Sequence, residues 1–126
     1  MIEQNTTQAE YWDQQGCQLC AAEDYVGAIA AYDKAIALNP RYAPAWSNRG
    51  NALSALKRQA EALNAYDKAI ALQPDYHQAW FNRALLLAEI GAYGNAAESY
   101  DRAIAILADP MYQHARASLE IKGQLV

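Results

Sequence analysis

Two cysteines separated by two residues, Cys17 and Cys20, are the first side chains whose spacing could support chemistry. A C-x-x-C pair occurs in thiol oxidoreductases and forms half of many zinc sites. A zinc site needs two further ligands, and the only histidines, His77 and His114, lie far along the chain. One hypothesis is therefore a redox or metal-binding function. The other, which we favour, is that both cysteines are small residues lining a binding surface, with no metal bound.

Other motifs that would indicate catalysis are missing from the sequence. It contains no G-x-S-x-G, no H-E-x-x-H and no glycine-rich phosphate loop. We therefore expect no enzymatic activity and no cofactor.

Three amide side chains, Gln14, Asn48 and Asn82, follow one another at equal intervals along the chain. A carboxamide both donates and accepts hydrogen bonds, so it can pair with a peptide bond whatever side chains the ligand carries. For the three amides to lie at equivalent positions, the elements that carry them must be copies of one repeated structural unit.

The rest of the sequence repeats with the same period as the amides. The segment YDKAIAL occurs at 32–38 and again at 66–72, and AWSNRGNAL at 45–53 is echoed by AWFNRALLL at 79–87. Trp12, Trp46 and Trp80 keep the same 34-residue step. A repeat of this length predicts a stack of similar supersecondary units, each burying its apolar face against the next.

The pattern of tryptophan, a small residue four positions later, then alanine, an aromatic residue and proline resembles the tetratricopeptide repeat. The resemblance covers residues 9–108. The matching residues are Trp12, Gly16, Ala28, Tyr32, Pro40, Trp46, Gly50, Ala62, Tyr66, Pro74, Trp80, Ala84, Ala96 and Tyr100. Small residues of this kind sit where two helices cross closely, and the large aromatics fill the remaining space.

The resemblance implies an all-α solenoid of three helix-turn-helix repeats and a C-terminal capping helix, about seven helices in all. The predicted parts are a lead-in (1–8), three repeats (9–42, 43–76 and 77–110), and a capping helix with a tail (111–126). We expect helices at about 9–22, 25–38, 43–56, 59–72, 77–90 and 93–107. Together these parts would form a self-contained module.

Capping residues predict where two of these helices begin. Thr7 followed by Glu10 fits a capping box for the first helix. Asp109 can cap the last helix, with Pro110 at its first position. In that helix Tyr112, Ala115 and Leu119 form one apolar face.

In this family the first helix of each pair lines a concave groove. Applied by register, the resemblance implies that the groove contains Asp13, Gln14, Cys17, Ser47, Asn48, Asn51, Gln78, Phe81, Asn82, Leu85 and Glu89. The three amides resemble the asparagine ladder with which O-GlcNAc transferase grips an extended peptide. The alternative is that they are solvated residues on a helix face.

Phe81 and Leu85 lie one helical turn apart in the third repeat and would leave apolar area exposed. Such a patch tends to mark a partner site. It could equally be covered by the C-terminal helix or by a second copy of the chain.

The carboxylate-clamp members of the family grip acidic C-termini with Lys and Asn in the first repeat and Lys and Arg in the third. This chain has Asp13, Cys17, Gln78 and Asn82 at those places, and only Asn48 matches. We therefore expect a neutral or basic ligand rather than an acidic one.

Two arginines, Arg49 and Arg83, each follow an aspartate at the same spacing, Asp33 and Asp67 respectively. Adjacent helices would bring Asp33 to Arg49 and Asp67 to Arg83 as ion pairs between repeats. Asp101 has no arginine at this spacing.

The net charge of −4, from 14 acidic and 10 basic residues, argues against a nucleic-acid partner. The N-terminus lacks the pattern of a secretory signal, and no apolar stretch approaches the ~20 residues that span a bilayer. We expect a cytoplasmic adaptor, scaffold or assembly chaperone that binds a partner segment in its groove. A self-associating structural module is the alternative.

Overall fold

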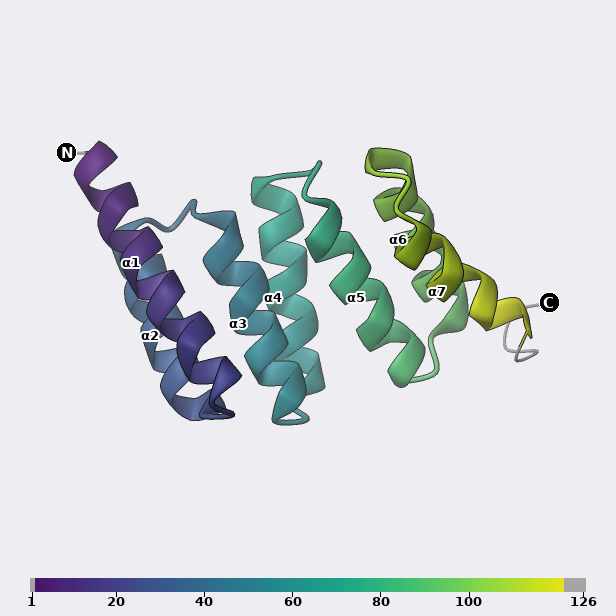
Figure 1. Cartoon of the computed structure of the whole chain (residues 1–126), viewed down its shortest axis with the longest axis horizontal. Helices are drawn as coiled ribbons and strands as arrows, with labels where there is room; N and C mark the ends of the chain where they lie inside the picture. Colours follow the sequence, from purple (N-terminus) through teal and green to yellow (C-terminus); the bar gives the residue numbers. More distant parts are fainter. Residues whose placement is uncertain (1, 122–126) are drawn as a thin grey trace. The chain divides into compact units, whose positions relative to one another are not determined.

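The structure of the chain is a computed structural model that describes residues 2–121. Over these residues the chain forms seven α-helices and no strand (Figure 1): α1 (Ile2–Ala21), α2 (Tyr25–Leu38), α3 (Ala43–Ala55), α4 (Gln59–Leu72), α5 (His77–Glu89), α6 (Tyr93–Ile106) and α7 (Pro110–Ile121). The predicted all-α fold is confirmed. The helices form two compact units, Met1–Pro74 (unit 1) and Asp75–Val126 (unit 2).

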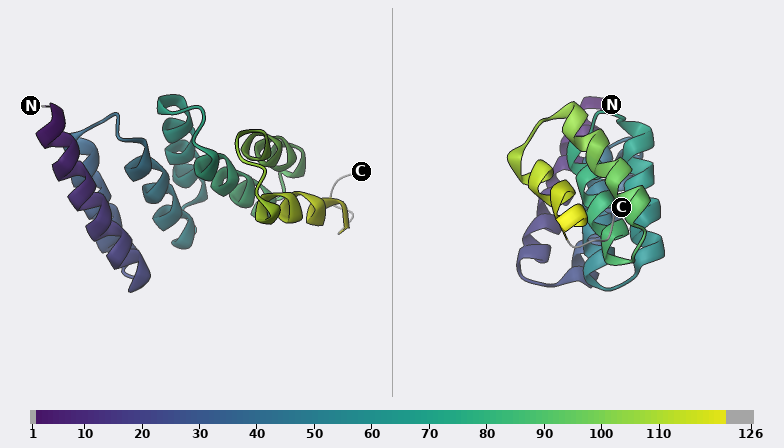
Figure 2. Two further views of the ribbon diagram at one scale, coloured as in Figure 1. Left: turned by 45° about the horizontal axis from the view of Figure 1, so that its top comes forward. Right: turned by 90° about the vertical axis from the view of Figure 1, so that its right-hand side faces the viewer.

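Unit 1 consists of two helical hairpins. Helix α1 packs along α2 and α3 along α4, while α3 also contacts α2 and α1. The paired helices lie side by side in Figure 1 and in the left view of Figure 2. The ring of Tyr66 fills the gap in the second hairpin, where a Cβ on Gly50 would lie 2.6 Å from the Tyr66 Cε1 atom. Tyr32 covers Gly16 in the same way in the first hairpin. The small residues are therefore required by close contact.

Unit 2 consists of one hairpin and the last helix. Helix α5 packs along α6, and α7 packs against α6. Tyr100 of α6 is 2% exposed, and alanines of both α5 and α6 are fully buried. The side chains of Tyr112 and Leu119, each 3% exposed, bury α7 against this hairpin. The predicted apolar face of the last helix is thus the face that packs.

Each tryptophan of the repeat is paired with a cation from the second helix of its own hairpin. Lys34 Nζ lies 4.2 Å from the centre of the Trp12 ring. The equivalent groups are Lys68 over Trp46 at 5.8 Å and Arg102 over Trp80 at 5.7 Å. These cation–π contacts lie on half-buried rings and help to hold the two helices of each hairpin together.

The turn inside each hairpin has the same backbone conformation. Glu23, Lys57 and Gly91, which occupy equivalent positions of the three repeats, have φ angles of 62°, 62° and 89°. In the second hairpin the N–H of Arg58 donates to the carbonyl of Leu53, and that of Lys57 to Ser54. This pair of bonds is the Schellman arrangement, in which a left-handed residue ends a helix and satisfies its last carbonyl groups.

Two capping predictions have different outcomes. The N–H of Met111 donates to Asp109 Oδ1 at 2.8 Å, so Asp109 caps α7 as predicted. The capping box at Thr7 is wrong, because α1 begins at Ile2 and Thr7 lies inside the helix. No proline or glycine interrupts residues 2–8, so nothing stops the helix from extending through most of the predicted lead-in.

Candidate functional site

Helices α1 and α3 place a cluster of polar groups at their contact. The Asn48 amide donates from Nδ2 to Asp13 Oδ1 at 3.0 Å and approaches Cys17 Sγ at 3.6 Å. The Asp13 residue is only 8% exposed. Burial raises the pKa of the Asp13 carboxyl group; the Asn48 hydrogen bond opposes this change and the charge of Glu10 adds to it. Asn48 is therefore engaged within the protein by an acidic group.

The two cysteines share a buried phenol. The hydroxyl group of Tyr32 lies 3.5 Å from Cys17 Sγ and 3.6 Å from Cys20 Sγ, and neither cysteine is in a disulfide. Burial raises the pKa of the Cys17 thiol, and burial together with the two thiols raises the pKa of Tyr32. A raised thiol pKa reduces the thiolate fraction on which redox chemistry and metal binding depend. Among the side chains described, no group of three or more His, Cys, Asp or Glu could hold a metal ion.

The remaining predicted residues of unit 1 divide into exposed and buried ones. Gln14 and Asn51 are exposed, and Asn51 Oδ1 accepts a 2.6 Å hydrogen bond from the Tyr66 hydroxyl group. Ser47 needs correction: it is 1% exposed, because α3 packs against both α1 and α2, and it cannot reach a ligand. The accessible or half-buried residues here, Gln14, Cys17, Asn48 and Asn51, together with Asp13 are called the α1–α3 face below.

In unit 2, the predicted apolar patch is partly covered by the last helix. The Phe81 ring stacks on Tyr112 with a centroid distance of 4.4 Å and lies 5.8 Å from Tyr100. The Tyr112 hydroxyl group lies 2.7 Å from His77 Nδ1. Of the two predicted residues, Leu85 remains 45% exposed, whereas Phe81 is half-buried.

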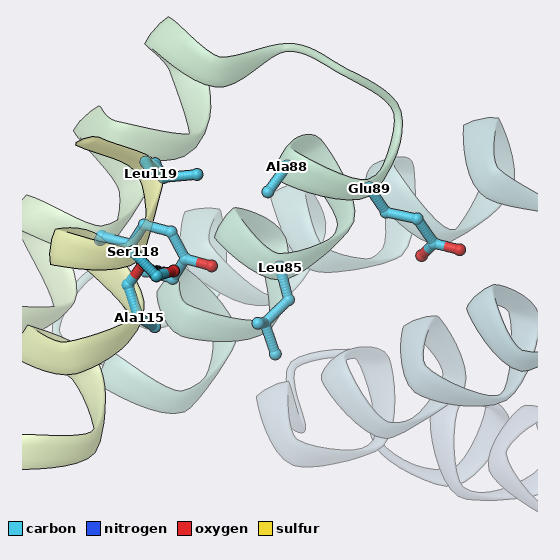
Figure 3. A pocket seen from close by; sticks show the side chains of 7 residues that line it. Leu85, Ala88, Glu89, Ala115, Ser118 and Leu119 are labelled. Carbon is cyan, nitrogen blue, oxygen red and sulfur yellow. Dashed lines mark hydrogen bonds between the residues drawn. The ribbon is translucent and has the colours of Figure 1, made fainter. Parts of the chain in front are cut away.

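A cleft of about 310 Å³ opens between α5 and α7 (Figure 3). Its lining residues are Leu85, Ala88, Glu89, Tyr100, Ala115, Ser118 and Leu119. The register predicted Leu85 and Glu89 on this surface, while Gln78 is exposed and Asn82 half-buried on the same helix. The contribution of α7 was not predicted, although the apolar spacing of Ala115 and Leu119 was visible in the sequence. These lining residues are called the α5–α7 cleft below.

One predicted ion pair is present. Arg49 Nε lies 2.7 Å from Asp33 Oδ1, between the second helix of one repeat and the first helix of the next. The pair Asp67–Arg83 would join the two units and stays a prediction; within unit 2, Arg83 donates to the buried Ser99 hydroxyl group at 2.6 Å.

The pairs were predicted from one fixed spacing between aspartate and arginine, and this spacing does not hold for the capping helix. Asp101 pairs with Arg116 at 3.1 Å, one position short of the spacing that joins Asp33 to Arg49. The connection before the capping helix, residues 107–109, is shorter than the connection before α3, residues 39–42, so a different position of the chain lies opposite the aspartate.

Models of known protein families match the repeated segments of the sequence. Family models described as Tetratricopeptide repeat match residues 43–76 and 65–105, and one described as TPR repeat matches 16–57. Helical hairpins in this order define an all-α solenoid of the kind that serves as a protein-interaction module. The chain belongs to the tetratricopeptide repeat family. Among curated proteins, none matches the sequence.

Solved structures share the fold. The first TPR domain of Spaghetti (RPAP3), bound to the HSP90 peptide SRMEEVD, is 20% identical with a TM-score of 0.87, covering 93% of this chain and 94% of that one. The Arabidopsis OM64 TPR domain is 21% identical with a TM-score of 0.87, covering 94% and 98%. The TPR2B domain of yeast Sti1, in a pHsp70 complex, is 27% identical with a TM-score of 0.78, covering 94% and 93%.

No helix in the described part of the chain has both the length and the apolar character needed to cross a membrane.

Proposed function

We propose that this chain is an adaptor, scaffold or assembly chaperone that binds an extended, neutral or basic segment of a partner protein. In unit 1 the binding surface is the α1–α3 face; unit 2, taken by itself, offers a second binding surface on α5. Family membership supports a protein-interaction module, and two domains of the same fold occur with partners: that of RPAP3 with an HSP90 peptide and that of yeast Sti1 in a pHsp70 complex. The exposed or half-buried amides Gln14, Gln78 and Asn82 can pair with a peptide backbone.

The observation that carries the charge preference is the hydrogen bond from Asn48 to Asp13. Asn48 is the one residue that matches the carboxylate clamp, and its Nδ2 donor is directed at a carboxylate of the chain itself, 3.0 Å away. An acidic ligand at this point would meet Asp13 and, beside it, Glu10, whose charge already disfavours ionisation of Asp13. Like charges brought together oppose binding, so a neutral or basic segment is favoured.

Two other hypotheses receive less support. Self-association through the Phe81–Leu85 patch is less favoured, because Tyr112 of α7 stacks on Phe81 and reduces the apolar area available to a second copy. A thiol function loses support, because the pKa of Cys17 is raised rather than lowered.

The proposal is tested by selecting linear dodecapeptides on the immobilised chain by phage display. The affinities of selected peptides are then measured by fluorescence anisotropy. Asn82→Ala should weaken binding by about three- to tenfold, the effect of losing one hydrogen bond.

Asn64 on α4 supplies the matched control, since it is an exposed amide on the second helix of a hairpin. Asn64→Ala should leave the affinity unchanged. Equal losses in both variants, or no loss in either, would contradict binding by the first helices.

A further inference from the structure

The α5–α7 cleft has the form of a pocket for a single side chain. In Figure 3, Leu85 and Ala88 of α5 lie opposite Ala115, Ser118 and Leu119 of α7, whereas the carboxylate of Glu89 points away from α7 at the rim of the cleft. Ala88 and Ala115 are small and leave room between Leu85 and Leu119, and Tyr100, which is 2% exposed, closes the inner side. A volume of about 310 Å³ lies at the lower limit for ligand pockets, which run from roughly 300 to 1,000 Å³.

The lining of the cleft combines apolar surface with one acidic group. Leu85 is 45% exposed, so apolar area is available for contact. Glu89 is an exposed carboxylate at the end of α5 and the one charged residue among those that line the cleft. Tyr100 also lines it, but burial raises the pKa of its phenol, so this group adds no charge. Glu89 therefore contributes the only formal charge among the residues that line the cleft, and this charge is negative.

We propose that the α5–α7 cleft receives one branched aliphatic side chain of the partner segment, and that Glu89 selects a lysine or arginine next to it. The inference rests on the proposed function and specifies its ligand in unit 2. The aliphatic group fills the space between Leu85 and Leu119, and the cation pairs with the carboxylate of Glu89. This charge complementarity favours a basic partner over an acidic one.

A second copy of the chain fits the cleft less well than a peptide does. Stable interfaces bury about 800 Å² on each partner, from roughly 20–30 residues a side. The cleft is lined by only seven residues and is bounded by the contact of α7 with the α5–α6 hairpin.

The contacts of Tyr112 keep the two walls of the cleft together. Its ring stacks on Phe81 of α5, and its hydroxyl group lies 2.7 Å from His77 Nδ1. The α7 wall is thus fixed to α5 before a ligand arrives, which lowers the cost of ordering it on binding.

The test uses NMR titration of the ¹⁵N-labelled full chain with three acetylated and amidated hexapeptides. The first is Gly-Ser-Leu-Lys-Ser-Gly, the second has alanine in place of leucine, and the third has glutamate in place of lysine. The first peptide should shift amide signals around the cleft on α5 and α7. The alanine peptide should bind about tenfold or more weakly, and the glutamate peptide about three- to tenfold more weakly.

Glu89→Lys should reverse the preference between the lysine and glutamate peptides. Glu98→Lys is the matched control, because Glu98 is an exposed glutamate on α6 that does not line the cleft. This control should keep the wild-type preference. Equal behaviour of the two variants, or a glutamate peptide that binds as tightly as the lysine peptide, would overturn the proposal.

The location of the shifts separates this inference from the proposed function. Shifts confined to α1 and α3 would overturn the pocket and leave peptide binding by the α1–α3 face standing. If display-selected peptides bind without any shift of amide signals at the cleft, the pocket is likewise overturned and the proposed function stands.

Discussion

Asp13 is a carboxyl group whose ionisation the fold opposes. Its pKa is raised above 3.8, mainly by burial, with Asn48 acting in the opposite direction. Because the folded protein favours the protonated form, the resulting stabilisation is fully present below pH 3.8. It is lost as the pH rises through the pKa of the folded state.

This sign leads to a prediction for Asp13→Asn. Asparagine has the same shape and can still accept the hydrogen bond from Asn48, but it carries no charge. The variant should have a higher Tm than the wild type at pH 7, and the difference should shrink as the pH falls towards 3. Thermal unfolding, followed by circular dichroism from pH 3 to 7, measures this difference in Tm. A variant less stable than the wild type at pH 7 would show that the ionised carboxylate stabilises the fold.

Gly50 is required by the Tyr66 ring rather than by backbone conformation. A Cβ at this position would lie 2.6 Å from Tyr66 Cε1, so Gly50→Ala forces a buried ring to move. We expect a loss of about 1–3 kcal/mol in the free energy of unfolding, typical of an overpacked core.

Gly94 is the matched control for this prediction. It also lies in a helix, but a Cβ there would meet nothing within 4 Å. Gly94→Ala should be neutral or stabilise by up to about 1 kcal/mol, through helix propensity alone. Urea denaturation compares the two variants. A similar change in both would mean that the contact with Tyr66 is relaxed at little cost.

Among the elements, the turns inside the hairpins combine one backbone geometry with different residues. Lys57 has a φ of 62°, which costs a residue with a Cβ about 1–2 kcal/mol, whereas Gly91 adopts 89° at no such cost.

Lys57→Gly should therefore stabilise the chain, and Gly91→Ala should destabilise it, by about 1 kcal/mol each. Space does not limit the second substitution, since a Cβ on Gly91 would meet nothing within 4 Å. Both free energies come from urea denaturation of the full chain. Destabilisation by Lys57→Gly would indicate that the lysine side chain matters more than the backbone angle.

Most elements could be predicted from the sequence, because a constant repeat period fixes every hairpin once one is recognised. The predicted helix 25–38 agrees with α2 at both ends. The predicted start of α1 was wrong, because the repeat says nothing about residues before its first copy. The cation–π pairs were missed for another reason: they depend on how side chains lean across a hairpin, which the period does not encode.

For the molecule as a whole, the candidate site was only partly predictable. The register correctly brought Asp13 and Asn48 to neighbouring helices, but it could not show that one residue would engage the other. It also could not show that Ser47 would be buried or that Tyr112 would cover Phe81. These outcomes depend on packing between helices, whereas the repeat specifies only the position of each residue along its own helix.

The charge preference of the binding surface is the central claim, and one comparison tests it directly. The full chain is titrated with SRMEEVD, the peptide bound in the RPAP3 structure, and with its charge-reversed analogue SRMKKVK carrying an amidated C-terminus. Calorimetry at low and at physiological salt gives both affinities. We predict that the basic peptide binds about tenfold or more tightly than the acidic one at low salt, and that added salt reduces the ratio. Tighter binding of SRMEEVD would contradict the account, because it would require an acidic ligand to be accepted beside Asp13 in unit 1 or beside Glu89 in unit 2.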